Sequence, residues 1–245
     1  MTNYTVILQY DGSRYDGWQK QGNTDNTIQG KLESILEKLA GQPVEVHGSG
    51  RTDAGVHALG QAANFHLEGG RTAEEVMDYL NRYLPEDIAV TEAKTVPERF
   101  HSRLNAVSKT YVYRIETGDK KMVFERKYIY GLGRELDLEK MRQAAKYLVG
   151  EHDFKSFCAN KRMKKSTVRR LYGIEITREG SRVYLLFTGN GFLHHMVRIM
   201  TGTLIEVGLS ERSPESVEEI LGAKDRQAAG YTAPAEGLFL KNVEY

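Results

Sequence analysis

The sequence predicts a mixed α+β fold made of two related lobes, and three observations support this. In the first hundred residues, segments with the period of two that is typical of strands enclose two segments with the helical period of 3.6. A second series of strand and helix patterns runs from residue 110 to the end. The chain has 245 residues, which is enough for two hydrophobic cores of ordinary size.

The first lobe opens with a strand over residues 4–10, where apolar and polar residues alternate until Asp11-Gly12-Ser13 ends the run. A helix follows over 28–39, with Asn26 or Thr27 as its cap and Gly41 as its stop. Strands are expected at 43–47 and 61–67, then a helix that Thr72 and Glu75 open as a capping box, and a strand at 88–96. This βαββαβ order is that of a ferredoxin-like unit, which many RNA-binding modules share.

The second lobe repeats this theme. We expect strands at 110–117, 168–177, 182–188 and 237–245, a helix at 138–149 and an apolar helix at 192–207. The prediction is therefore two ferredoxin-like, RRM-like lobes, residues 1–103 and 104–245, with a continuous, mostly antiparallel sheet.

Composition narrows the classes of protein. No apolar run is long enough to cross a bilayer, and the first residues lack the basic and apolar regions of a secretory signal. The single cysteine, Cys158, has no partner for an internal disulfide, and between Phe157 and Ala159 it is expected to be a small buried apolar group. We expect a cytoplasmic protein.

Neither a metal nor an organic cofactor is predicted. There are seven histidines but no His-Glu-x-x-His motif, and His194 and His195 would point in different directions on a helix. The chain also lacks the glycine-rich phosphate and dinucleotide loops.

The net charge is only +1, but the charges are unevenly distributed. Residues 99–115 and 160–172 contain no acidic residue. The second stretch holds six cations: Lys161, Arg162, Lys164, Lys165, Arg169 and Arg170. Such stretches favour an RNA or phosphate partner, and two solvated faces are the alternative.

One carboxylate stands in a turn of small residues, Gly50 to Ala58. Glycines allow close approach of a ligand to the backbone, so Asp53 can be exposed and aimed, with Arg51 beside it. A plain Asx-turn is the alternative interpretation.

Two further residues have a chemical interpretation. Tyr111 lies on a predicted strand, on the same face as Tyr113, where a core position is the default. Arg198 lies in an apolar stretch and therefore requires a carboxylate or phosphate partner, for which Asp53 is a candidate.

Six motifs are spread in order along nearly the whole chain: Tyr10-Asp11-Gly12 with Gly17-Trp18-Gln19, Gly50 to Ala58, Phe100-His101-Ser102-Arg103 with Lys109 to Tyr113, Gly150 to Phe154, Gly191 to Arg198 with Gly202, and Ala233 to Leu238. Together they resemble the TruA family of tRNA pseudouridine synthases. The resemblance implies that Asp53 is the nucleophile, and that the family's motif tyrosine and arginine correspond to Tyr111 and Arg198.

The resemblance further implies isomerisation of uridine to pseudouridine at positions 38, 39 and 40 of the tRNA anticodon arm, without metal or cofactor. It also implies a homodimer with its site in a central cleft between the lobes. Tyr111 would stack on the uracil, Leu238 would form an apolar wall, and Arg51 would fill the gap left by the extruded nucleotide or hold its phosphate. Asp53 would attack either the sugar or the pyrimidine ring.

Two rival classes remain at this stage. A non-catalytic RNA-binding module would use the same basic segments but would not need Asp53, Tyr111 and Arg198. An aspartyl-nucleophile hydrolase is a weaker alternative, because the sequence has no cluster of metal-binding carboxylates.

Overall fold

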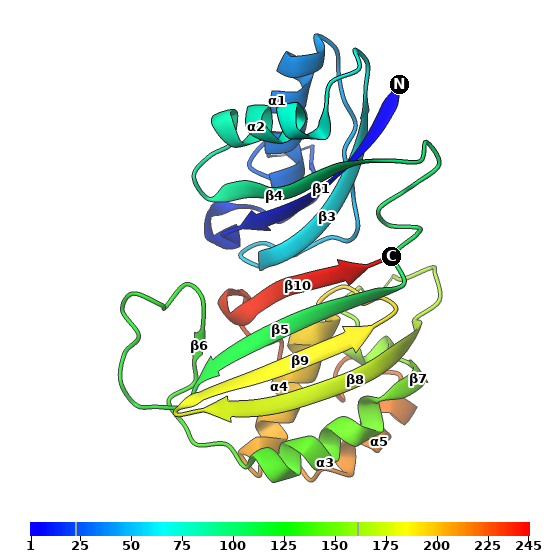
Figure 1. The fold of residues 1–245 in the computed structure, drawn as a ribbon. Coiled ribbons are helices and arrows are strands. Elements are labelled where there is room, and N and C mark those ends of the chain that lie inside the picture. Colours follow the sequence, from blue (N-terminus) through cyan, green and yellow to red (C-terminus); the bar gives the residue numbers. More distant parts are fainter. Residues whose placement is uncertain (23, 161) are drawn as a thin grey trace. The chain divides into compact units, whose positions relative to one another are not determined.

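The computed structural model describes residues 1–22, 24–160 and 162–245. By packing, the chain divides into two units (Figure 1). Unit 1 comprises Met1–Val107 and Phe239–Tyr245, and unit 2 comprises Ser108–Leu238. The last strand is thus grouped with unit 1, and the lobes predicted at 1–103 and 104–245 stay a prediction.

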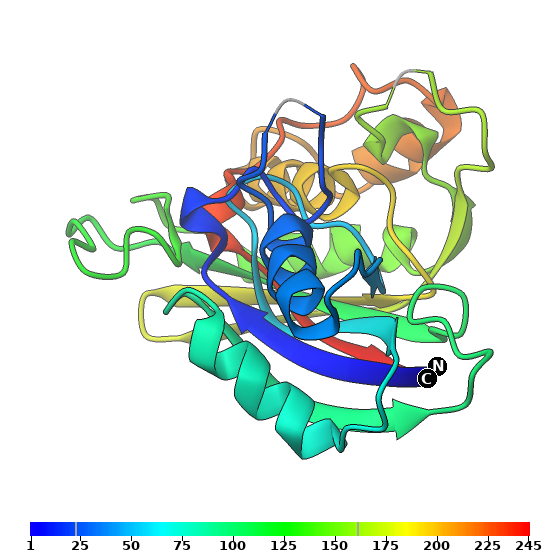
Figure 2. The ribbon, with the colours of Figure 1, turned by 90° about the horizontal axis from the view of Figure 1, so that it is seen from above.

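Besides a 3-10 helix at Gly12–Arg14, unit 1 contains five strands and two α-helices among the residues described. They are β1 (Thr2–Tyr10), α1 (Ile28–Ala40), β2 (His47–Gly48), β3 (His57–Leu67), α2 (Ala73–Tyr83), β4 (Ile88–Val96) and β10 (Leu238–Glu244). The strands follow the order β4-β1-β3, and both β2 and β10 pair with β3. The antiparallel order β4-β1-β3-β2 is that of a ferredoxin-like unit, as predicted. In Figure 2, α1 and α2 lie over these strands.

The two helices of unit 1 begin where the sequence indicates. The Thr27 side chain caps α1 by accepting from the amide of Gly30, and Gly41 ends the helix with a φ of 71°. Thr72 and Glu75 form the predicted capping box of α2.

The strand expected over 43–47 is wrong, because β2 covers only His47–Gly48. The main chain just before β2 bonds to side chains of α1 instead of to another strand. The amide of Val46 donates to Glu33 Oε1 at 3.2 Å, and its carbonyl accepts from Gln29 Nε2 at 3.1 Å.

Strand β1 is buried on both faces, although its sequence alternates between apolar and polar residues. Asn3 is 2% exposed, and its amide donates to the carbonyls of Pro97 and Phe100 at 3.1 and 2.9 Å. Asn64 of β3 accepts from the amide of Ser102 at 2.8 Å. Two buried asparagines therefore hold the segment 97–102 against β1 and β3 within unit 1.

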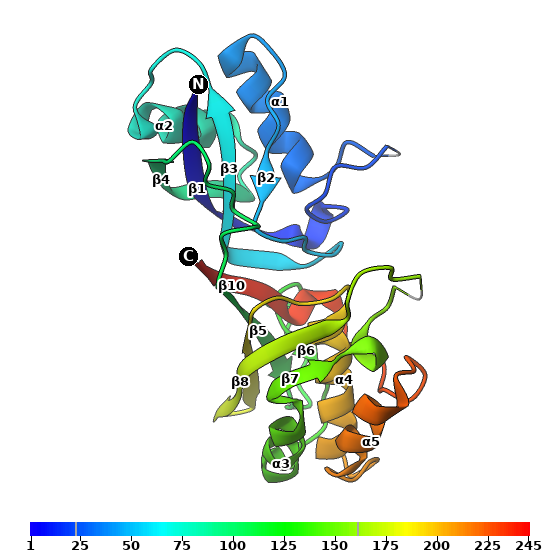
Figure 3. The same cartoon turned by 90° about the vertical axis from the view of Figure 1, so that its right-hand side faces the viewer.

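Unit 2 contains the strands β5 (Ser108–Glu116), β6 (Tyr130–Gly131), β7 (Gly150–Asp153), β8 (Val168–Glu179) and β9 (Arg182–Gly189). Its helices are α3 (Leu138–Leu148), α4 (Met196–Gly208) and α5 (Ser216–Ala223). The strand order β5-β9-β8-β7 is antiparallel throughout, and β6 pairs with β5 in parallel. Figure 3 shows the three helices on one side of this sheet.

The helix predicted over 192–207 begins later than expected, at Met196. His195, which precedes it, takes a left-handed conformation with a φ of 59°, and His194 and His195 form a turn that the Met196 amide closes by donating to the Leu193 carbonyl at 3.0 Å. The elements β6, β7 and α5 were not predicted from the sequence. β6 and β7 have only two and four residues, which is too short to show a strand period.

Hydropathy gives one further result. Among the residues that the structure describes, no helix is both long enough and apolar enough to cross a membrane.

Candidate active site

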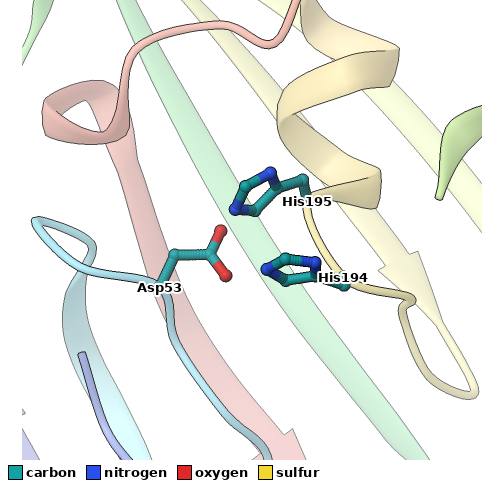
Figure 4. A group of neighbouring side chains, drawn as sticks. All are labelled: Asp53, His194 and His195. Carbon is teal, nitrogen blue, oxygen red and sulfur yellow. The ribbon is translucent and has the colours of Figure 1, made fainter. Parts of the chain in front are cut away.

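Asp53 lies in unit 1, on the loop that joins β2 to β3 (Figure 4). Its side chain is half-buried, and the neighbouring Thr52 is buried. The loop has no regular secondary structure, so its shape depends on bonds from elsewhere in the unit.

The segment just after β1 supplies those bonds. The Trp18 amide donates to the Thr52 carbonyl at 3.0 Å, and the Gly55 amide donates to the Tyr15 carbonyl at 3.3 Å. Within the loop, the Val56 amide donates to the Asp53 carbonyl at 3.1 Å. These bonds fix the main chain on both sides of Asp53, and they therefore fix the Cα atom from which its side chain extends.

Gly17 makes this close approach possible. It has a φ of 94°, and a Cβ atom at this position would lie 2.6 Å from the Thr52 carbonyl oxygen. Both the backbone conformation and the space therefore require glycine.

Side-chain hydrogen bonds also hold the Asp53 loop and the start of β3. The Tyr10 hydroxyl hydrogen-bonds Thr52 Oγ1 at 2.9 Å, and burial raises the pKa of Tyr10, so this hydroxyl stays protonated. The Gly12 amide donates to His57 Nδ1 at 3.0 Å. A Cβ atom on Gly12 would lie 2.0 Å from the Val56 carbonyl oxygen. These interactions give a structural reason for the Tyr10-Asp11-Gly12 and Gly17-Trp18 motifs.

Arg51 stands at the exposed side of the loop. Its Nε donates to Gln19 Oε1 at 2.9 Å, which fixes the stem of the side chain. The preceding carbonyl, that of Gly50, accepts from Gln61 Nε2 at 3.0 Å.

Tyr111 lies in unit 2, on β5, and is 7% exposed. Its ring meets the ring of Phe192 edge to face, with centroids 5.1 Å apart. Tyr113 is fully buried and donates from its hydroxyl to the Pro234 carbonyl at 2.7 Å. Burial raises the pKa of Tyr113, so it remains a donor.

Arg198 lies in the first turn of α4 and is half-buried. Its Nε donates to the Ala233 carbonyl at 2.7 Å, and the Ala233 amide donates to the Arg198 carbonyl at 3.1 Å. This reciprocal pair joins α4 to the segment that leads to Leu238, which is 4% exposed. Within unit 2, that segment is further held by Gly237, where a Cβ atom would lie 2.8 Å from the ring of Tyr113.

The expectation that His194 and His195 point in different directions is wrong. Their ring centroids lie 3.9 Å apart. The two residues precede α4 instead of lying within it, and the left-handed backbone of His195 turns the rings together; Figure 4 labels both.

The second basic segment leads from a short 3-10 helix, Lys155–Phe157, into β8. Arg162, Lys164, Lys165 and Arg170 are exposed, and Lys161 lies outside the described residues. Arg169 donates to the carbonyls of Ser166 and Val168 at 3.0 and 2.6 Å, so its guanidinium braces its own loop.

The comparisons with known proteins agree with one another. A family model described as tRNA pseudouridine synthase matches residues 6–105 and 144–245. The tRNA pseudouridine synthase A of Bacillus sp. (strain KSM-64) is 50% identical over 245 residues, with all of both chains covered. The tRNA pseudouridine synthase A 2 of Bacillus cereus (strain ZK / E33L) is 47% identical, again with full coverage. The tRNA pseudouridine synthase A 2 of Clostridium tetani (strain Massachusetts / E88) is 46% identical, with 99% of this chain and 98% of the relative covered.

The fold and the matched residues thus define an RNA-modifying isomerase that acts on uridines of tRNA. More particularly, the chain belongs to the tRNA pseudouridine synthase A family. The resemblance drawn from the sequence motifs is confirmed, and the non-catalytic RNA-binding alternative is not supported.

Gly17-Trp18-Gln19 is one of the motifs of the family resemblance, but sequence reasoning did not predict that residues 15–18 hold the Asp53 loop. Tyr15 and Trp18 act there through main-chain atoms, which any residue type supplies, so their roles leave little trace in the sequence. The one available signal was Gly17, because an isolated glycine beside an apolar residue indicates a close backbone approach.

Proposed function

We propose that this protein converts uridine to pseudouridine at positions 38, 39 and 40 of the tRNA anticodon arm, with Asp53 as the nucleophile. The observation that supports Asp53 most directly is the fixed main chain around it. A nucleophile held in one geometry reacts as part of a unimolecular step, which lowers the entropic part of the barrier.

The reaction is an isomerisation, so its atoms balance without a co-substrate. The bond between C1′ and N1 breaks, a bond between C1′ and C5 forms, a proton leaves C5 and a proton is gained at N1. A single carboxylate can carry the covalent step, by attack on either the sugar or the pyrimidine ring. No metal or organic cofactor is required by this chemistry.

Other residues have supporting roles in this proposal. Tyr111 stacks on the uracil and is the candidate acceptor of the C5 proton. Arg198 orients the Asp53 carboxylate, for which a planar guanidinium is well suited. Leu238 forms an apolar wall, and Arg51 occupies the space of the extruded nucleotide or holds its phosphate.

On a larger scale, we propose that the two sheets are continuous and that the site lies in a cleft between the lobes of a homodimer. The basic segment of Lys161, Arg162, Lys164, Lys165, Arg169 and Arg170 contributes to tRNA binding. Its absence of acidic residues supports this, because RNA binding depends on neutralising backbone phosphates.

The test is incubation of the purified protein with unmodified tRNA transcripts, without added cofactor, followed by mapping of pseudouridine at each position. We expect product at one or more of positions 38, 39 and 40. Product only at other uridines would refute the positional proposal while leaving the isomerase activity intact.

Asp53→Ala should abolish product formation while tRNA binding and thermal stability change little. The half-buried side chain leaves no large cavity, and an anion adds no attraction for a phosphate backbone. Each 1.4 kcal/mol of lost transition-state stabilisation costs about tenfold in rate. The matched control is Asp78→Ala on the exposed side of α2, which should keep full activity. Measurable turnover by Asp53→Ala would remove Asp53 from the chemistry.

A further inference from the structure

Unit 2 contains a hollow of about 760 Å³ between the start of β8 and the segment after α5. Three stretches that are distant in sequence line it, around residues 153–160, 163–168 and 224–227. Its charged lining consists of five cations, Lys155, Lys164, Lys165, Lys224 and Arg226, and two carboxylates, Asp153 and Asp225.

One of the two carboxylates is already neutralised within the fold. Asp153 accepts from the hydroxyl of Thr167 and the amide of Lys155, and Lys224 Nζ lies 3.3 Å from its second oxygen. The hydrogen bond from Thr167 and the charge of Lys224 lower the pKa of Asp153, so the carboxylate is ionised at neutral pH and its charge is matched.

The remaining cations are not matched in this way. Within the described part of the chain, no carboxylate lies within ion-pair distance of Lys155, Lys164, Lys165 or Arg226. Arg226 is half-buried and donates to two neutral oxygens, those of Ala229 at 3.4 Å and Thr232 at 3.0 Å. Burial lowers the pKa of Arg226 more than the charge of Glu206 raises it, so the guanidinium is not fully compensated within the fold. A partly desolvated guanidinium with unused donors is stabilised by an anion.

The lining also indicates which part of a nucleic acid fits. None of the described residues around the hollow is aromatic. A pocket that selects a nucleobase or a free nucleotide would be expected to offer a stacking surface, whereas lysines, one arginine and short polar side chains suit phosphate oxygens.

We propose that this hollow is a binding site for the sugar–phosphate backbone of the tRNA, formed by Lys155, Lys164, Lys165, Lys224 and Arg226. The proposal rests on the proposed tRNA function, and it adds three cations from outside the basic segment that the sequence indicates. The site contributes to the affinity for tRNA and takes no part in the chemical step.

The test compares two triple variants that each remove three positive charges. The first, Lys155→Gln/Lys164→Gln/Lys165→Gln, changes exposed side chains of the hollow. The control, Lys38→Gln/Lys94→Gln/Lys146→Gln, changes exposed lysines that do not line it. The dissociation constant for a tRNA transcript is measured over a range of salt concentrations.

We expect the hollow variant to bind tRNA at least tenfold more weakly than the parent. Its dependence of log K on log salt should flatten by roughly 0.7–0.9 for each phosphate that the variant no longer neutralises. The control should stay within about threefold in affinity, and the single-turnover rate of the hollow variant at saturating enzyme should equal that of the parent. Equal decreases in affinity in both variants would overturn the proposal, and so would a slower single-turnover rate.

A second measurement uses the unmodified protein. Chemical acylation of its lysines should be suppressed by bound tRNA at Lys164 and Lys165, but not at Lys38 or Lys146. Equal protection by inorganic phosphate or a mononucleotide at the same phosphate concentration would assign the hollow to a small anion and overturn the RNA site. The binding data test whether the hollow binds tRNA even if pseudouridine mapping detects no product. The backbone site and the proposed isomerisation are therefore tested separately.

Discussion

At the scale of single residues, one hydrogen bond from the guanidinium of Arg198 to the main chain fixes the position of its side chain. Its Nε donates to the Ala233 carbonyl at 2.7 Å, and a guanidinium carries two terminal nitrogens with further N–H donors. A lysine has one nitrogen and cannot hold a carbonyl and orient a carboxylate with the same geometry.

We therefore expect Arg198→Lys to lower turnover at saturating tRNA at least tenfold, with a small change in melting temperature. A suitable control is Arg142→Lys on α3, because Arg142 also donates to a main-chain carbonyl, that of Ile176, at 3.0 Å. The control should keep its turnover. A fully active Arg198→Lys would restrict Arg198 to its bond with Ala233.

Gly17 provides a residue-scale test of how the Asp53 loop is held. Gly17→Ala places a methyl group 2.6 Å from the Thr52 carbonyl oxygen and imposes a positive φ on an alanine, so the loop must shift. We expect a decrease of roughly 1–3 kcal/mol in the free energy of unfolding and a fall in turnover under conditions where the variant is folded.

Denaturant unfolding and single-turnover assays measure the two effects. Gly22→Ala is the control, since among the described residues other than its chain neighbours no atom lies within 4 Å of a Cβ placed there. Parental turnover in Gly17→Ala would mean that the loop tolerates displacement and that its fixed geometry is not needed.

At the scale of elements, one carboxylate joins three segments of unit 2. Asp153 ends β7, and its partners Thr167 and Lys224 lie just before β8 and at the end of α5. Such a residue stabilises the packing of short elements that have little core of their own.

Asp153→Asn should lower the free energy of unfolding by about 1–2 kcal/mol at pH 7, as expected for hydrogen bonds to a charged group. The folded-state pKa of Asp153 is lowered, so its contribution is present above the unfolded value of about 3.9 and is lost as the pH falls through the folded value. Denaturant melts at pH 7 and at decreasing pH should show the two proteins converge in acid. The control Glu151→Gln, on an exposed position of the same strand, should show no such difference. A constant gap at all pH values would contradict this account.

At the scale of the whole molecule, the proposed homodimer means that two chains are available to bind one tRNA. The proposed homodimer follows from the family resemblance, and a second copy would double the basic surface of a chain whose net charge is only +1. Light scattering at micromolar concentration and moderate salt should give twice the mass of one chain. A mass equal to one chain would contradict the dimer.

The sequence by itself predicted most of the elements and the turn around Asp53, because both are encoded locally. Helix starts at Thr27 and Thr72, the stop at Gly41 and the strand at 88–96 follow from capping and periodicity over a few neighbouring residues. The turn of Asp53 was recognisable for the same reason, since its glycines and carboxylate are adjacent in sequence.

Only the tertiary structure decided what depends on interactions between distant residues. It replaced the strand at 43–47 with bonds to α1, and it showed that residues 15–18 hold the Asp53 loop through main-chain atoms. It also brought Lys155, Lys164 and Arg226 to one hollow, although in sequence Arg226 stands beside an acidic residue and shows no basic pattern. Local propensities act within one helix or strand. Hydrogen-bond partners and charge clusters depend on how several helices, strands and loops pack together, and this packing leaves no periodic pattern in the sequence.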